Sequence, residues 1–135
     1  MAGMLYLVPT PIGNLGDISK RARETLESAD FISAEDTRVT LKLLNHLELK
    51  KPLVSYYEHN KSFKGEKILD RILAGETCAL VSDAGSPAIS DPGEDLVKQC
   101  AAAGIPVCAI PGPCAAITAL SISAQSTGRF CFEGF

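Results

Sequence analysis

Short apolar runs alternate along the chain with longer segments in which apolar residues recur at helical spacing. The five runs are residues 5–8, 31–34, 52–56, 77–81 and 105–110. Each has the length of a buried strand. The segments between and after them predict helices at about 19–28, 41–47, 63–73, 94–103 and 115–121. Strands that alternate with helices predict an α/β fold, a five-stranded, mostly parallel sheet with helices on both faces.

The same pattern predicts how individual helices face the sheet. Ser19 is the predicted N-cap of the first helix. Leu41 and Leu44 mark the predicted apolar face of the second helix, and Phe63 and Leu73 belong to that of the third. A helix with one apolar stripe buries that stripe against a sheet and exposes its opposite side to water.

Three segments rich in glycine and proline each follow a predicted strand. They are residues 9–16, 83–93 and 111–115. Because the strands are predicted to be parallel, their carboxyl ends meet at one edge of the sheet, where α/β proteins bind ligands. Glycine lets the backbone approach a ligand closely, and proline shapes a loop before binding. The pattern therefore predicts a preformed site for a small molecule.

The residues of these loops narrow the class of ligand. The loops contain no lysine or arginine, and the chain has neither the GxGxxG dinucleotide motif nor the GxxxxGK[ST] phosphate loop. A pyrophosphate ligand is therefore disfavoured, and a neutral or cationic adenosyl ligand held by backbone groups is favoured. No metal site is expected, because His46 and His59 have no partners at ligand spacing.

Length, charge and cysteine usage limit the protein class further. A chain of 135 residues can form one domain with a buried core. Its net charge of −3 supplies no overall basic field, which counts against an RNA partner unless a local patch provides one. Five cysteines without a CxxC pair predict reduced thiols and a cytoplasmic protein. No apolar run approaches the ~20 residues of a membrane-spanning helix, so no membrane partner is expected.

Four motifs, in order along the chain, resemble one known family. They are Pro-Thr-Pro-Ile-Gly-Asn-Leu at 9–15, Glu-Asp-Thr-Arg at 35–38, Ser-Asp-Ala-Gly-Ser-Pro-Ala-Ile-Ser-Asp-Pro-Gly at 82–93, and Pro-Gly-Pro-Cys-Ala at 111–115. Together they are similar to the tetrapyrrole (corrin/porphyrin) methylase superfamily, and most similar to its small-subunit ribosomal RNA cytidine 2′-O-methyltransferase branch. The tetrapyrrole branch has Gly-Gly-Asp-Pro where this chain has Ala-Gly-Ser-Pro at 84–87, which favours the RNA branch.

The resemblance implies the N-terminal domain of a class III methyltransferase that uses S-adenosylmethionine as methyl donor. It also implies two α/β domains with the donor in the cleft between them, a homodimer, and ribosomal RNA or the small ribosomal subunit as partner. Residues 1–124 are expected to form the donor-binding domain. Residues 125–135 contain three phenylalanines and no closing element. They are expected to be a linker and the start of a truncated C-terminal domain.

Carried over position by position, the resemblance implies donor contacts within the three loops. They are Ile12, Gly13, Ala84, Gly85, Ser86, Ile89, Cys114 and Ala115. We add Asp83, because it closely follows a predicted strand. A ribose hydroxyl must also lose its proton, and the candidate bases are Asp36, Glu58, His59 and Asp83, among which the sequence does not choose. Candidate phosphate contacts are Arg38, Lys61 and Lys64.

Two other functions remain compatible with the sequence. The same fold could methylate a tetrapyrrole-like small molecule, in which case tetrapyrroles would compete for the full-length protein. The chain could instead be a non-catalytic adenosyl-binding or RNA-binding module, which would bind the donor and transfer nothing.

Overall fold

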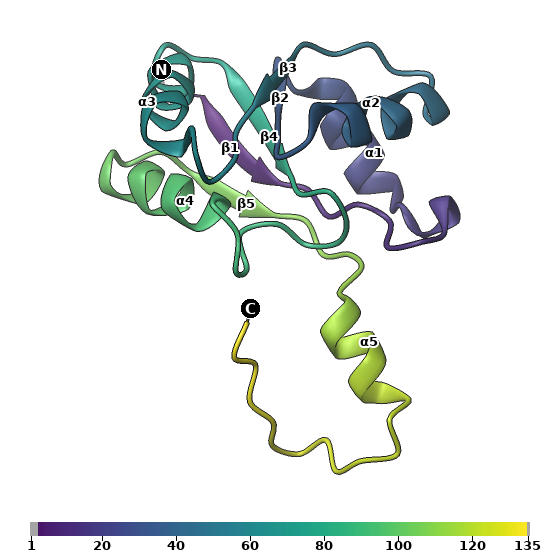
Figure 1. Ribbon diagram of the computed structural model, residues 1–135. Helices are drawn as coiled ribbons and strands as arrows, with labels where there is room; N and C mark the ends of the chain where they lie inside the picture. The colour runs from purple at the N-terminus through teal and green to yellow at the C-terminus, as the bar shows by residue number, and fades with distance from the viewer. Residues whose placement is uncertain (1–2, 135) are drawn as a thin grey trace.

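The predicted α/β fold is confirmed in the computed structural model, which describes residues 3–134. The strands are β1 (Met4–Leu7), β2 (Phe31–Ala34), β3 (Leu53–Ser55), β4 (Thr77–Val81) and β5 (Val107–Ala109). The helices are α1 (Lys20–Ser28), α2 (Thr37–His46), α3 (Lys61–Leu73), α4 (Gly93–Ala102) and α5 (Ala115–Ser121), with a 3₁₀ turn η1 at Leu15–Asp17. Figure 1 shows that the carboxyl ends of the strands point toward α5.

The five strands form a single sheet in the order β3-β2-β4-β1-β5, and every pairing between neighbours is parallel. β4 lies between β2 and β1, where Leu5 pairs with Cys78 on one side and Phe31 pairs with Cys78 on the other. The order of the strands therefore reverses beside β1 and β4. In open α/β sheets, ligands bind at the carboxyl side of such a reversal.

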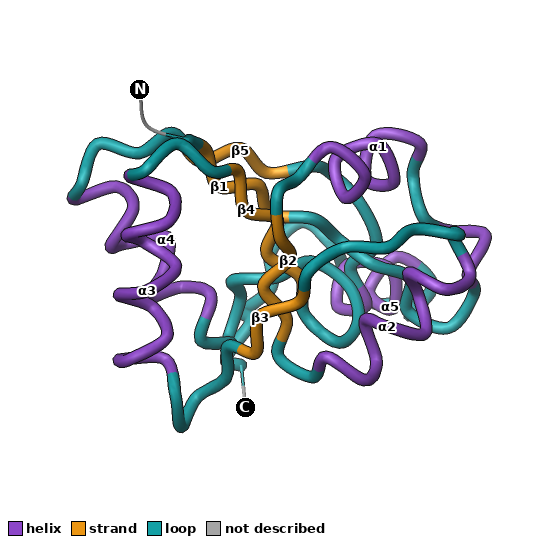
Figure 2. Tube along the Cα trace, turned by 90° about the horizontal axis from the view of Figure 1, so that it is seen from above, coloured by secondary structure: helices purple, strands orange, loops and turns teal. Residues whose placement is uncertain are grey.

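Helices cover both faces of the sheet, as Figure 2 shows by the two layers on either side of the strands. Side chains alternate along β4, so that Ala79 and Val81 pack with α1 and α2 while Cys78 and Leu80 pack with α3 and α4. All four are buried. A parallel sheet with both faces covered has strands that are almost continuously apolar, which is why the runs were visible in the sequence.

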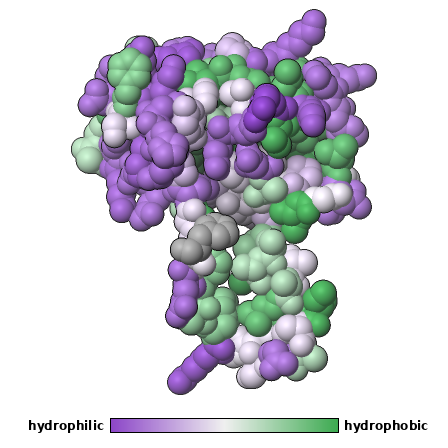
Figure 3. Space-filling model, viewed as in Figure 1, coloured by the Kyte–Doolittle hydropathy of each residue, from purple (hydrophilic) through white to green (hydrophobic). Residues whose placement is uncertain are grey.

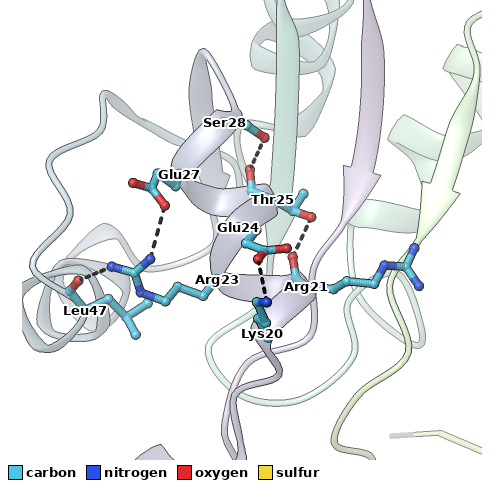
Figure 4. Close-up of polar contacts among 8 residues, drawn as sticks. All are labelled: Lys20, Arg21, Arg23, Glu24, Thr25, Glu27, Ser28 and Leu47. Carbon is cyan, nitrogen blue, oxygen red and sulfur yellow. Dashed lines mark hydrogen bonds and ion pairs between the residues drawn. The ribbon is translucent and has the colours of Figure 1, made fainter.

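Figure 4 shows hydrogen bonds and ion pairs on the outer surface of α1 and between α1 and Leu47. The hydroxyl of Ser19 accepts a hydrogen bond from the backbone N–H of Ala22 at 3.0 Å, so the predicted N-cap is confirmed. The Arg23 guanidinium pairs with Glu27 at 3.1 Å and also donates to the carbonyl of Leu47 at 3.2 Å. Exposed ion pairs stabilise little by themselves, but the bond to Leu47 links α1 to the end of α2.

The predicted inner faces of α2 and α3 were partly wrong. Leu41 is 50% exposed, Phe63 is 62% exposed and Leu73 is 46% exposed. The buried residues of α2 are Thr40, Leu43 and Leu44. The polar Thr40 therefore faces the core where we predicted the apolar Leu41. Phe63 lies on the first turn of α3, where the Lys67 ammonium sits 4.3 Å from the centre of its ring.

α5 extends from the carboxyl edge of the sheet and has no buried side chain. Residues 122–134 contain no helix or strand, and Phe135 lies outside the described residues. In Figure 3 this lower part of the molecule is largely green and white, in contrast to the mainly purple surface above it. The domain boundary at 124 stays a prediction. Among residues 3–134, no helix is both long and apolar enough to span a bilayer.

Replacing Tyr56 by phenylalanine should lower the free energy of unfolding by about 1 kcal/mol. Tyr56 is buried, and its hydroxyl donates a hydrogen bond to the carbonyl of Pro92 at 3.0 Å. Burial raises the pKa of Tyr56 to about 12, so the hydroxyl keeps its proton. Urea denaturation monitored by circular dichroism measures the loss, with Tyr57→Phe as a control because Tyr57 is exposed. Equal midpoints for Tyr56→Phe and the unchanged protein would contradict the prediction.

Candidate ligand-binding site at the carboxyl edge of the sheet

The three glycine- and proline-rich segments meet at one edge, as predicted. The observed loops differ slightly in extent from the predicted segments, and we call them the β1 loop (residues 8–14), the β4 loop (82–92) and the β5 loop (110–114). Thr10 and Gly85 join the first two, because each backbone N–H donates to the other residue's carbonyl, at 3.1 and 3.0 Å. The hydroxyl of Ser86 donates to the carbonyl of Pro113 at 3.1 Å and joins the β4 loop to the β5 loop.

The β1 and β5 loops also pack directly against each other. A Cβ atom at Gly112 would lie 2.2 Å from Cγ of Pro9, so only glycine allows this approach. Ile110 donates its backbone N–H to the carbonyl of Leu7 at 2.9 Å, which continues the sheet pairing into the loop. All three loops are therefore in mutual contact, and their shape is set before any ligand binds.

Asp91 determines the path of the β4 loop into α4. Its carboxylate accepts backbone N–H groups from Ala88 at 2.9 Å and from Gly93 at 2.7 Å. Burial raises the pKa of Asp91, and these hydrogen bonds oppose the shift. Ala88 and Ser90 have φ values of 69° and 54°. Residues other than glycine adopt this left-handed backbone region only at a cost in free energy. The Asp91 contacts hold the loop in this strained form.

An apolar pocket of about 390 Å³ lies between the three loops and α5; we call it the loop pocket. Of the predicted donor contacts, those that line it are Ile12, Ala84, Gly85, Ser86, Ile89, Cys114 and Ala115. The remaining walls come from Ala116, Ile117, Phe130 and Phe132. The structure therefore brings together predicted residues from three separate stretches of the sequence.

A second pocket of about 370 Å³ lies between the β1 loop and α2; we call it the α2 pocket. Gly13 and Asp83, the two predicted donor contacts absent from the loop pocket, line this one. Ile12 and Ala84, their neighbours in the chain, line the loop pocket. The two pockets thus share a wall made by the β1 and β4 loops.

The structure separates the four candidate bases into two groups. Asp36 and Asp83 lie together, since the backbone N–H of Asp36 donates to the Asp83 carboxylate at 3.2 Å. Glu58 and His59 follow β3, the outermost strand on that side of the sheet, and line neither pocket. Glu58 forms an ion pair with Lys61 at 2.9 Å.

Asp36 is occupied by its own neighbours. Its carboxylate caps α2 by accepting the backbone N–H of Arg38 at 2.9 Å, and it also accepts two bonds from the Arg38 guanidinium, at 3.1 and 2.9 Å. These side-chain hydrogen bonds lower the pKa of Asp36. A carboxylate that is stabilised in its charged form in this way is a weak proton acceptor.

Glu35 is an acid at this edge that the sequence reading did not single out as a base. Burial is the largest cause that raises the pKa of the Glu35 carboxyl. Three nearby carboxylates raise it further, those of Asp83, Asp91 and Asp36. The sequence shows each acid after a strand, but only the adjacency of β2 and β4 brings the two pairs together.

The candidate phosphate contacts also change. Lys61 bridges the carboxylates of Glu58 and Asp95, which raise its pKa. Arg38 is held by Asp36. Lys42, which the sequence reading passed over, lines the α2 pocket. Its position on α2, one turn after Arg38, is the signal that could have identified it.

The chain is similar to a known protein family and to several curated proteins. The family model for tetrapyrrole (corrin/porphyrin) methylases matches residues 4–130. A protein of Synechocystis sp. named ribosomal RNA small subunit methyltransferase I is 54% identical over 133 residues, 98% of this chain and 48% of its own. A protein of the same name from Halalkalibacterium halodurans is 56% identical, over 98% of this chain and 46% of its own. The chain spans about half the length of these curated relatives.

Solved structures share the fold at lower identity. Uroporphyrin-III-C-methyltransferase from Thermus thermophilus matches with a TM-score of 0.67 and 24% identity, over 90% of this chain and 52% of its own. Diphthine synthase matches with a TM-score of 0.72 and 15% identity, over 92% and 50%. The family model covers almost the whole chain, and the relatives are more than half identical. The chain therefore belongs to the tetrapyrrole (corrin/porphyrin) methylase family.

Proposed function

We propose that this chain is the donor-binding half of an S-adenosylmethionine-dependent methyltransferase that modifies the 2′-hydroxyl of a cytidine in small-subunit ribosomal RNA. The observation that carries the proposal is the loop pocket, whose walls gather most of the predicted donor contacts from three loops. The names of the relatives, which are more than half identical, support ribosomal RNA as the substrate class.

The chemistry of the loop pocket fits an adenosyl sulfonium. Its walls combine aliphatic side chains such as Ile12 and Ile89 with the small residues Ala84 and Gly85, and no lysine or arginine lines it. A Cβ at Gly85 would lie 3.3 Å from Cγ2 of Ile12, so a larger residue there would crowd this wall of the pocket. A positively charged ligand meets no like charge in these walls.

The donor supplies an electrophilic methyl group, and the protein supplies alignment. Well-aligned reactants can lower a barrier by ~7–11 kcal/mol. The three loops can align the donor because hydrogen bonds between them already fix their conformation, so little conformational entropy is lost when the ligand binds. The apolar lining of the loop pocket also keeps water away from the reacting group.

Asp83 is our candidate for the group that accepts the proton of the ribose hydroxyl. It lines the α2 pocket while the next residue, Ala84, lines the loop pocket. Its carboxylate accepts the backbone N–H of Asp36 at the end of β2. Asp36 is paired with Arg38. Glu58 and His59 follow β3, which is separated from β4 by β2.

Ribosomal RNA, free or in the small subunit, is the proposed partner, and the cytoplasm is the proposed compartment. The five free cysteines accord with a reducing compartment. Burial raises the pKa of the Cys100 thiol to about 11, so that thiol stays protonated. The homodimer implied by the resemblance stays a prediction.

A methylation assay tests the function directly. The full-length protein that carries this chain is incubated with S-adenosylmethionine labelled in the methyl group and with small-subunit RNA from a strain that lacks the modification. We expect label in one cytidine and resistance of that nucleotide to alkaline cleavage. Label transferred to a tetrapyrrole but not to RNA, or donor binding without transfer to any acceptor, would contradict the proposal.

Gly85→Val should reduce donor affinity by about 100-fold in calorimetry, because the added side chain would crowd Ile12 and the β5 loop and distort the pocket wall. Gly85 has a φ of 81°, and its Cβ would also lie 3.4 Å from the carbonyl of Pro113. Gly104→Val is the matched control, since Gly104 has a φ of 73° and open space around it. Both variants carry backbone strain, so equal donor affinity in the two would move the donor site elsewhere.

Asp83→Asn should lower kcat by about 10²–10⁴, with a much smaller change in donor affinity. The asparagine oxygen can still accept the N–H of Asp36, so the loop keeps its shape. Glu58→Gln is the control and should retain kcat, because Glu58 lines neither pocket. A loss of kcat in Glu58→Gln with normal turnover in Asp83→Asn would reverse the assignment.

A further inference from the structure

The side chain of Thr10 is buried without a hydrogen-bond partner. Thr10 is 4% exposed, and its hydroxyl oxygen has no partner among the described residues. Its backbone is fully used, since both its N–H and its carbonyl bond to Gly85. A buried hydroxyl without a partner is costly, and a ligand that bonds to it removes that cost. Thr10 lines the α2 pocket, so a ligand in that pocket could satisfy it.

The other walls of the α2 pocket suit a flat, partly polar ligand. Leu15 and Val39 are large apolar side chains that are 46% and 38% exposed, and both line the pocket with Pro11. Asp83 supplies a hydrogen-bond acceptor on the β4-loop side. At about 370 Å³ the pocket lies within the range of small-molecule sites. An unstacked RNA base is recognised in this way, by apolar packing on its faces and hydrogen bonds at its edge.

Charge around the α2 pocket favours an RNA backbone. α2 carries Arg38 and Lys42 and no acidic residue. The carboxylate of Asp36 occupies Arg38, whereas Lys42 forms no ion pair among the described residues and is exposed at the pocket. Lys42 therefore supplies a cation for a phosphate, a local patch in a chain whose net charge is −3.

We propose that the α2 pocket binds the acceptor nucleotide of the RNA, with the Thr10 hydroxyl bonded to it and Lys42 on a neighbouring phosphate. The inference rests on the proposed function and adds the place of the substrate. The pocket adjoins the loop pocket through their common wall, where Gly13 and Asp83 face one side and Ile12 and Ala84 face the other. A methyl donor and its acceptor need such adjacent sites, since transfer requires near contact.

Thr10→Val in the full-length protein tests the role of the hydroxyl. Valine keeps the shape of threonine and removes only the donor and acceptor. We expect KM for unmethylated small-subunit RNA to rise about threefold to tenfold. Calorimetric affinity for S-adenosylmethionine should stay unchanged, and the melting temperature should be unchanged or higher, because the lost hydroxyl has no protein partner. Thr10→Ser, which retains a hydroxyl, should restore most of the RNA affinity.

Ser33→Ala is the matched control. Ser33 is fully buried on β2, its hydroxyl also has no partner among the described residues, and it lines neither pocket. Removal of this hydroxyl should leave KM for RNA as it is. An equal rise of KM in Ser33→Ala and Thr10→Val would show a general effect on the fold and overturn the inference.

Lys42→Gln tests the phosphate contact. RNA binding should weaken, and the slope of the logarithm of affinity against the logarithm of salt concentration should fall by about 1. Unchanged RNA binding in both Thr10→Val and Lys42→Gln, with an active unaltered protein, would overturn the inference and leave the proposed function intact. A rise in the donor dissociation constant with unchanged KM for RNA would assign the pocket to the donor. Absence of methyl transfer by the unaltered protein would overturn both.

Discussion

The site depends on the pair of backbone hydrogen bonds between Thr10 and Gly85. These bonds join loops that follow two different strands, and they form only because β1 and β4 are neighbours in the sheet. Gly85 reaches the required geometry with a positive φ that costs glycine little. The same two bonds use up the backbone groups of Thr10 and leave its side chain as the unsatisfied group. One local pairing thus sets the wall between two pockets and leaves an unsatisfied, buried hydroxyl beside one of them.

The β1 and β4 loops line two pockets of different chemical character. Toward α5 they present aliphatic and small residues, and toward α2 they present a hydroxyl and a carboxylate that face the lysine of α2 across the pocket. Consecutive residues line opposite pockets, Ile12 and Gly13 in the β1 loop and Asp83 and Ala84 in the β4 loop. The division needs no large structural element. It follows from a few residues whose conformations are held by Asp91, by Ser86 and by the contact of Gly112 with Pro9.

Much of this arrangement was predictable from the sequence. Five buried parallel strands produce five apolar runs, and loops that must keep a fixed shape need glycine and proline, so both signals were visible. The neighbours of each strand were not visible, because strand order depends on which way each connection crosses the sheet. The adjacency of Glu35 to Asp83, and the use of Lys42 and Thr10, depend on that order. Leu41 was misplaced because the buried stripe of α2 includes a threonine, which no apolar count includes.

The carboxylates at the ends of β2 and β4 have a consequence for turnover. Burial raises the pKa of the Glu35 carboxyl, and the nearby carboxylates of Asp83, Asp91 and Asp36 raise it further, so negative charge gathers at this edge of the sheet. A sulfonium is attracted by negative charge, whereas the thioether left after transfer is electrically neutral and is not. Under the proposed function, this edge would attract the charged donor more strongly than the neutral product. Methyl transfer would remove the positive charge that favours donor binding, and the loss of this attraction would favour replacement of the product by a new donor.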